Sequence, residues 1–163
     1  MIILGIDPGL ATIGFGVISA DKGVFSAIDY GIVSTPKDEG HPVRLKMISD
    51  GISALIDKYK PDQIAVEQLF FAKNVKTALS VAEARGVILL TAVVKCGRLY
   101  EYTPNQIKVA ITGYGSADKY QMQNMVKILL KLSDIPRPDD AADALAVALC
   151  HAQTNRFSNL HIL

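Results

Sequence analysis

Four acidic residues, each set against apolar sequence, constrain this chain more than any other feature. Asp7 and Glu67 each end a short apolar run. Asp140 and Asp143 stand three residues apart in an alanine-rich stretch. An ionised carboxylate is costly to bury unless a positive group pairs with it, and no Lys or Arg is built into these stretches near the acids. A divalent cation bound by all four acids would resolve this conflict.

Each acid also has an ordinary explanation of its own. Asp7 suits a turn at Asp-Pro-Gly, and Glu67 suits an edge strand. Negative charge at a helix N-terminus is favourable by about 0.3–1 kcal/mol, which accounts for Asp139 and Asp140. It accounts poorly for Asp143, which lies deeper among Ala, Leu and Val. The four acids together therefore favour a metal site, and without a His among them Mg²⁺ is preferred to zinc.

Length and composition indicate one domain of an α/β protein. We expect residues 1–155 to form this domain and residues 156–163 to be a loose tail. No run reaches the roughly 18 to 20 apolar residues of a membrane span, and the N-terminus lacks a signal-peptide pattern. Cys96 and Cys150 show no disulfide or metal spacing, so both are interpreted as reduced core residues. A soluble, cytoplasmic protein without a membrane partner is expected.

The charge is distributed unevenly, although the formal net charge is only +1. Residues 68–131 carry nine basic and three acidic residues, whereas the segments on both sides are net acidic. A basic surface flanked by acids suits a polyanion lying across an acidic metal site. The alternative is a solvated helix face with no partner.

The hydrophobic pattern predicts a mixed five-stranded sheet with flanking helices. Turn signals separate the first three strands, which suggests antiparallel pairing. The fourth strand follows a helix, so it should run parallel to the first and bring Asp7 and Glu67 to the same edge. The second half of the second helix is apolar all round except Thr91, which predicts burial on more than one side. The predicted strands are Ile2–Asp7, Ile13–Ser19, Val24–Val33, Gln63–Glu67 and Leu99–Thr103, and the predicted helices are Val43–Tyr59, Asn74–Lys95, a short one from Pro104, Ala117–Leu132 and Asp139–Gln153.

Several further side chains are candidates for binding or packing. Asp140 and Asp143 share one helix face at i and i+3. Ser116 is a plausible N-cap after a glycine-containing turn, and it places Lys119 in the first helical turn, which suits a phosphate cradle. The alternative for Lys119 is an ordinary surface lysine. His151, near the end of the last helix, is interpreted as suiting the helix dipole.

Two adjacent phenylalanines follow Glu67 directly. Phe70 and Phe71 cannot both point into one core from a strand, because successive side chains point to opposite faces. One of them is expected to be exposed beside the basic face, where it could stack on unpaired bases. The alternative is that both anchor the loop.

These residues and segments resemble the RuvC-type Holliday junction resolvases, within the ribonuclease H-like nucleases. The first segment alone is also similar to sugar kinases, but the set in this order is specific. The match covers Met1 to about His151. It is carried by Gly5-Ile6-Asp7-Pro8-Gly9, Glu67-Gln68-Leu69-Phe70-Phe71-Ala72-Lys73-Asn74, Ala84-Arg85-Gly86-Val87, Gly113-Tyr114-Gly115-Ser116-Ala117-Asp118-Lys119 and Asp140-Ala141-Ala142-Asp143-Ala144-Leu145-Ala146.

The resemblance implies a structure-selective endonuclease that resolves four-way DNA junctions by paired nicks. It implies a homodimer with two Mg²⁺ ions per subunit, for which Mn²⁺ substitutes, and a branch-migration motor of the RuvA and RuvB type as partner. The implied catalytic and metal-binding carboxylates are Asp7, Glu67, Asp140 and Asp143. Lys119 is implied as a further catalytic residue, and the expected DNA contacts are Phe70, Phe71, Lys73, Lys76, Lys108, Ser116 and Lys119.

Two other functions compete with this interpretation. Ile6-Asp7-Pro8-Gly9 also suits a phosphotransferase of the actin and sugar-kinase type, but 163 residues lack the second lobe and second phosphate loop that such kinases need. A non-catalytic nucleic-acid scaffold is the other alternative, and a complete set of four carboxylates argues against it.

Overall fold

The structure is a computed structural model that describes residues 1–69 and 75–154. The predicted DNA contacts Phe70, Phe71 and Lys73 lie outside the described residues, as does the side chain of Lys76.

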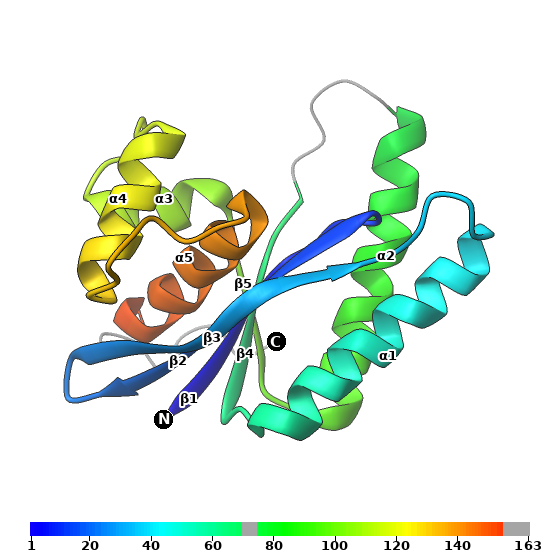
Figure 1. The fold of residues 1–163 in the computed structure, drawn as a ribbon, viewed down its shortest axis with the longest axis horizontal. Coiled ribbons are helices and arrows are strands. Elements are labelled where there is room, and N and C mark those ends of the chain that lie inside the picture. The colour runs from blue at the N-terminus through cyan, green and yellow to red at the C-terminus, as the bar shows by residue number, and fades with distance from the viewer. Residues whose placement is uncertain (70–74, 155–163) are drawn as a thin grey trace.

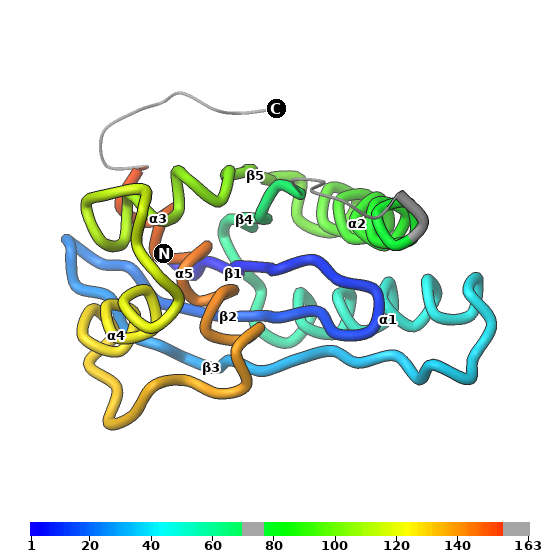
Figure 2. Tube along the Cα trace, turned by 90° about the horizontal axis from the view of Figure 1, so that it is seen from above, coloured from blue at the N-terminus to red at the C-terminus, as the bar shows by residue number. Residues whose placement is uncertain are grey.

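A five-stranded mixed sheet forms the centre of the molecule, as the sequence predicts. Strands β1, β2 and β3 pair antiparallel, and β4 and β5 extend the sheet in parallel from β1, which gives the order β3-β2-β1-β4-β5. Figure 2 shows this order, with β3 and β5 at opposite edges. The strands are β1 (Ile2–Asp7), β2 (Thr12–Asp21), β3 (Val24–Ser34), β4 (Gln63–Glu67) and β5 (Leu99–Tyr102).

Helices cover both faces of the sheet. Figure 1 shows α3, α4 and α5 on one side and α1 and α2 on the other. Each side has its own core, one built around α5 and the other between the sheet, α1 and α2. The helices are α1 (His41–Tyr59), α2 (Val75–Lys95), α3 (Pro104–Thr112), α4 (Lys119–Leu129) and α5 (Asp139–Thr154).

Helix α4 begins later than the sequence predicts, because its N-cap is Asp118. The Asp118 side chain accepts from the Gln121 amide, and the Gln121 side chain bonds back to the Asp118 amide, which forms a capping box. The prediction that Ser116 is the N-cap is therefore wrong. Lys119 is nevertheless the first helical residue, as expected.

Helix α5 lies directly on the backbone of β1 and β2. A Cβ atom on Gly5 would lie 2.2 Å from the carbonyl oxygen of Ala144, and one on Gly14 would lie 2.0 Å from that of Asp140. Both distances are shorter than atoms tolerate, so only glycine permits this approach. The contact brings the acidic start of α5 to the sheet beside the end of β1.

The prediction that His151 suits the helix dipole is wrong, because this histidine is fully buried. Its Nδ1 lies 2.7 Å from the hydroxyl of Tyr102, and its Nε2 lies 2.6 Å from the Oε1 of Gln63. Burial lowers the pKa of His151 to about 4, so the ring is neutral at pH 7. It joins α5 to β4 and β5 within the core. Both cysteines are free, as predicted; Cys150 is buried, and Cys96 is partly buried and packs against the core on the α1 and α2 side.

The second half of α2 is not buried on several sides, which corrects the sequence prediction. Ala84, Ile88 and Ala92 face the core, whereas the opposite side is exposed. The apolar residues on that exposed side are Leu79, Leu90, Val93 and Val94. The helix therefore covers the core with one apolar stripe and presents a second stripe outward.

Helix α2 is also long and apolar enough to cross a membrane by length and composition, although Glu83 and Arg85 interrupt its apolar run. The segment concerned is Thr77–Lys95, and only 22% of it is buried. A single helix of this kind is weak evidence for a span. Its inner stripe packs in the core, and its outward stripe is left exposed in the single chain.

Candidate active site

The ends of β1 and β4 place two carboxylates side by side. The strands pair in parallel with Ile6 opposite Val66, so Asp7 and Glu67 occupy the next position on each. Asp143 approaches them from α5. These three acids line one pocket with a cavity volume of about 250 Å³. Its other lining residues are Pro104, Ile107, Lys108, Lys119, Met122 and Ala146.

Asp140 lies at the edge of this group rather than in the pocket lining. It sits in the first turn of α5, whose backbone rests against Gly14 of β2. Its negative charge still acts on Asp7, whose pKa it helps to raise. The structure therefore brings the four predicted acids into one electrostatic cluster, with three of them around the pocket.

Burial and the neighbouring acidic charges raise the pKa of Asp7, Glu67 and Asp143. Burial, and then the charges of Glu67, Asp143 and Asp140, raise the pKa of Asp7 to about 8. Burial and Asp143 raise the pKa of Glu67 to about 7, against the opposing effects of Lys108 and a hydrogen bond with Asp7. Burial also raises the pKa of Asp143. If all of these acids were ionised, their negative charge would exceed the positive charge of the two nearby lysines, and a bound cation would offset the excess.

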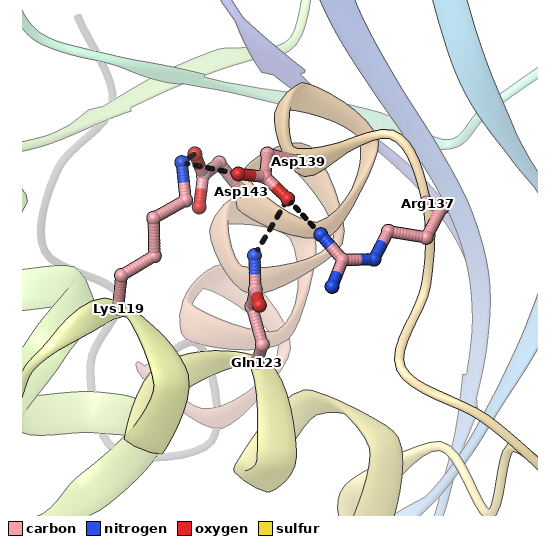
Figure 3. Close-up of polar contacts among 5 residues, drawn as sticks. All are labelled: Lys119, Gln123, Arg137, Asp139 and Asp143. Atoms are coloured by element: carbon pink, nitrogen blue, oxygen red, sulfur yellow. Dashed lines mark hydrogen bonds and ion pairs between the residues drawn. The ribbon is translucent and has the colours of Figure 1, made fainter.

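The donor set fits a hard divalent cation by its chemistry, because all the ligands are carboxylate oxygens. Within residues 1–69 and 75–154, no group of three or more acidic, His or Cys side chains is arranged to hold a metal ion as it stands. Figure 3 shows that the ammonium group of Lys119 faces Asp143, and it lies 3.4 Å from a carboxylate oxygen of that residue. A cation bound at Asp143 would therefore compete with Lys119.

Two lysines supply positive charge to the pocket from α3 and α4. Lys119 pairs with Asp143 and also with Asp139, at 3.2 Å. Lys108 lines the same pocket, and its charge lowers the pKa of Glu67. The two predicted phosphate contacts therefore lie at the acidic site. Ser116 is exposed in the loop before α4 and does not line this pocket.

Two features of the site were not identified from the sequence. Asp139 was interpreted only as a helix-terminal charge, yet it shares Lys119 with Asp143. The close backbone contact of α5 with Gly5 and Gly14 was also not predicted. Two glycines in the middle of strands were the available signal, because glycine in a strand often marks a close approach of backbone.

Replacing Asp7 by Asn should stabilise the metal-free protein in a pH-dependent way. The pKa of Asp7 rises from 3.8 to about 8 on folding, so between these values the folded state holds a proton that the unfolded state has lost. The wild-type free energy of unfolding should therefore fall as pH rises through this window, and level off above it. Asn cannot ionise, so the advantage of Asp7→Asn should grow from pH 4 to 8.

Urea denaturation in EDTA at several pH values would measure this difference. A difference between variant and wild type that stays constant from pH 4 to 9 would contradict the raised pKa.

The chain is similar to curated proteins over nearly its full length. It is 52% identical over 160 residues to the crossover junction endodeoxyribonuclease RuvC of Alkaliphilus oremlandii, covering 98% of each chain. It is 51% identical over 156 residues to that of Clostridioides difficile, covering 96% of this chain and 92% of the relative.

Solved structures of the same kind match the fold. Thermus thermophilus RuvC matches with a TM-score of 0.88 at 35% identity, covering 96% of both chains. Thermus thermophilus RuvC in complex with its Holliday junction substrate matches with a TM-score of 0.90 at 34% identity, covering 96% of this chain and 95% of that one. The family described as crossover junction endodeoxyribonuclease RuvC matches residues 3–151. The chain, with its acidic pocket at the ends of β1 and β4, therefore belongs to the RuvC family.

Proposed function

We propose that this protein is a metal-dependent, structure-selective endonuclease that resolves four-way DNA junctions in recombination and repair. The observation that carries the proposal is the pocket itself. Asp7, Glu67 and Asp143 meet there from three separate elements, with Lys108 and Lys119 beside them. Carboxylates that hold cations next to lysines that bind phosphate are what hydrolysis of a phosphodiester requires. Such an enzyme acts on DNA in the cytoplasm.

We assign the metal-binding role to Asp7, Glu67, Asp140 and Asp143, with Mg²⁺ as the physiological ion, two per subunit, and Mn²⁺ as a substitute. Bound ions would supply an activated water and stabilise the leaving 3′ oxygen, so that cleavage leaves 5′-phosphate and 3′-hydroxyl ends. The chain's own contribution is to hold the carboxylates in a partly buried pocket, where their attraction for a cation is screened less than in open solvent.

Cleavage of a four-way junction is the direct test of this function. The protein should nick a synthetic junction in Mg²⁺, leave a linear duplex of the same arm sequences intact, and be inactive in EDTA. A panel of junctions with varied core sequences would also show its sequence preference at the nick. Equal cleavage of the duplex and the junction would contradict structure selectivity, and cleavage in EDTA would contradict the metal requirement.

We propose that Lys108 and Lys119 contact the phosphates beside the scissile bond. Lys119→Ala should reduce the slope of log affinity against log salt by about one unit, because one phosphate contact is lost. It should also slow cleavage, since Lys119 lies 3.4 Å from the metal-ligand carboxylate of Asp143. Fluorescence anisotropy in Ca²⁺ at several salt concentrations would measure the slope, with Lys22→Ala, in the β2–β3 turn, as the control. An unchanged slope and rate would make Lys119 an ordinary surface lysine.

We further propose that the protein works as a homodimer and cooperates with a branch-migration motor of the RuvA and RuvB type. A four-way junction is nearly two-fold symmetric, and two matched nicks need two copies of one site in a fixed relation. The outward apolar stripe of α2 is the surface available for the second subunit. Phe70 and Phe71 as base-stacking residues, with Lys73, Lys76 and Ser116 as DNA contacts, remain part of this proposal.

A further inference from the structure

The carboxylate of Asp139 is held in one orientation by two neighbours. Its Oδ1 accepts from the Nε2 of Gln123 at 3.0 Å and from a guanidinium nitrogen of Arg137 at 2.7 Å. Its Oδ2 faces the ammonium group of Lys119 at 3.2 Å. Figure 3 shows the three donors converging on Asp139 from α4 and from the segment before α5. One oxygen is fixed, and the other is presented to Lys119.

Gln123 makes this arrangement more than a surface contact. Its side chain is only 5% exposed, on the inner side of α4. A buried amide is costly unless it is hydrogen-bonded, and Asp139 is the acceptor for its Nε2. The hydrogen bonds that the described residues give to Asp139 come from the side chains of Gln123, Arg137 and Lys119, not from the first-turn amides that a helix-capping carboxylate would accept.

Lys119 is shared between this fixed carboxylate and the pocket. Asp139 and Asp143 lie four residues apart on α5 and so share one face of the helix. Burial lowers the pKa of Lys119, but Asp143 and Asp139 together more than offset it, so the pKa is raised and the side chain stays charged. In the metal-free protein Lys119 is thus the counter-ion of Asp143, and a divalent cation at Asp143 competes with it.

We propose that Asp139 is a positioning residue that retains Lys119 at the rim of the pocket when a divalent cation takes over Asp143. The inference rests on the proposed function, because it takes Asp143 as a metal ligand. With Asp139 present, Lys119 keeps one carboxylate partner after it releases Asp143, so a metal ion displaces it from Asp143 with little loss of ion-pair energy. The ammonium group also stays near the substrate phosphate. Without Asp139, Asp143 is the remaining partner, so Lys119 opposes the metal more strongly.

A double-mutant cycle on Mg²⁺ binding tests this coupling without DNA. Isothermal titration would compare wild type, Asp139→Asn, Lys119→Met and the double variant. Asp139→Asn should weaken Mg²⁺ binding about two- to fivefold, the range that one partly exposed ion pair supports. In the Lys119→Met background the same change should have almost no effect. If Asp139 acted instead by attracting the metal ion directly through its negative charge, the change would have equal effects in both backgrounds, and that result would overturn the inference.

Two further variants separate the positioning role from charge and from folding. Gln123→Met keeps the side-chain volume and does not touch Lys119, so it should weaken Mg²⁺ binding in the same direction by releasing Asp139. Asp134→Asn removes a charge from the segment before α5, away from the ion pairs of Lys119, and should leave Mg²⁺ binding unchanged. An unchanged affinity in Gln123→Met, or a loss in Asp134→Asn equal to that in Asp139→Asn, would overturn the inference.

Cleavage kinetics provide the remaining measurement. At saturating Mg²⁺ and junction, Asp139→Asn should lower kcat with little change in KM, and Asp139→Glu should restore most of the rate. A wild type that bound Mg²⁺ and cleaved junctions, but showed no coupling in the cycle, would overturn this inference alone. A wild type that bound no Mg²⁺ would overturn the proposed function with it.

Discussion

Asp7→Asn is expected to reduce junction cleavage by at least about a thousandfold while leaving junction binding nearly unchanged. Losing a metal ligand removes several kcal/mol of transition-state charge stabilisation, and each 1.36 kcal/mol is a factor of ten in rate. Binding should persist because affinity for the DNA backbone comes from cationic side chains. Single-turnover cleavage in Mg²⁺ and anisotropy in Ca²⁺ would measure the two quantities. Glu67→Gln and Asp143→Asn should behave in the same way.

The control for this experiment is a carboxylate outside the site. Asp21→Asn removes an exposed charge at the end of β2 and should leave cleavage at the wild-type rate. Because Asp7→Asn should also stabilise the metal-free fold, inactivity cannot then be attributed to unfolding. Near-normal cleavage by any of the three site variants would refute the assignment of their carboxylates.

The second large effect is expected at the exposed side of α2. Leu90→Glu should weaken self-association at least about a hundredfold if the outward stripe of α2 is the interface, because it would bury an unpaired charge in each subunit's apolar contact surface. The monomer should stay folded, since the side chain of Leu90 is 66% exposed. Sedimentation velocity at micromolar concentration would give the association state, and circular dichroism the fold.

Ile128→Glu is a closely matched control. Ile128 is 64% exposed on α4, so the substitution introduces the same charge at a similarly exposed apolar position on another face. This variant should remain dimeric. Gly86→Leu provides a second probe, because a Cβ there meets nothing within 4 Å in the single chain, so the substitution should leave the fold intact and act on association. If Leu90→Glu and Gly86→Leu both stayed dimeric, the interface would lie elsewhere.

The sheet was predictable because the signals that determine its strand pairing lie in short stretches of sequence. Turn signals marked the antiparallel strands, and the helix between β1 and β4 implied their parallel pairing. That pairing placed Asp7 beside Glu67, which is half of the site. The strand limits differ from prediction by at most two residues, as at Ser19 against Asp21. Boundaries shift in this way because end residues gain or lose only one ladder hydrogen bond.

The remaining differences come from tertiary contacts that no periodicity encodes. An apolar helix such as α2 looks the same whether its second stripe meets its own core or another molecule. The position of His151 near a helix end suggests an interaction with the helix dipole, and only the fold shows that Tyr102 and Gln63 bond to its ring. The link from Lys119 to Asp139 depends on how α4 packs against α5, and the sequence spacing between them carries no information about that angle.

The glycines under α5 have a consequence for how this site can change over evolution. Side-chain packing can be rearranged by compensating substitutions, but a contact between a strand Cα and a helix carbonyl has no side chain that could adjust. A single methyl group at Gly5 or Gly14 would push the helix that carries Asp140 and Asp143 away from the strand that carries Asp7. The distance between the acids on α5 and the acid on β1 therefore depends on Gly5 and Gly14, which take no part in the chemistry. A search for inactivating variants that watched only charged residues would overlook them.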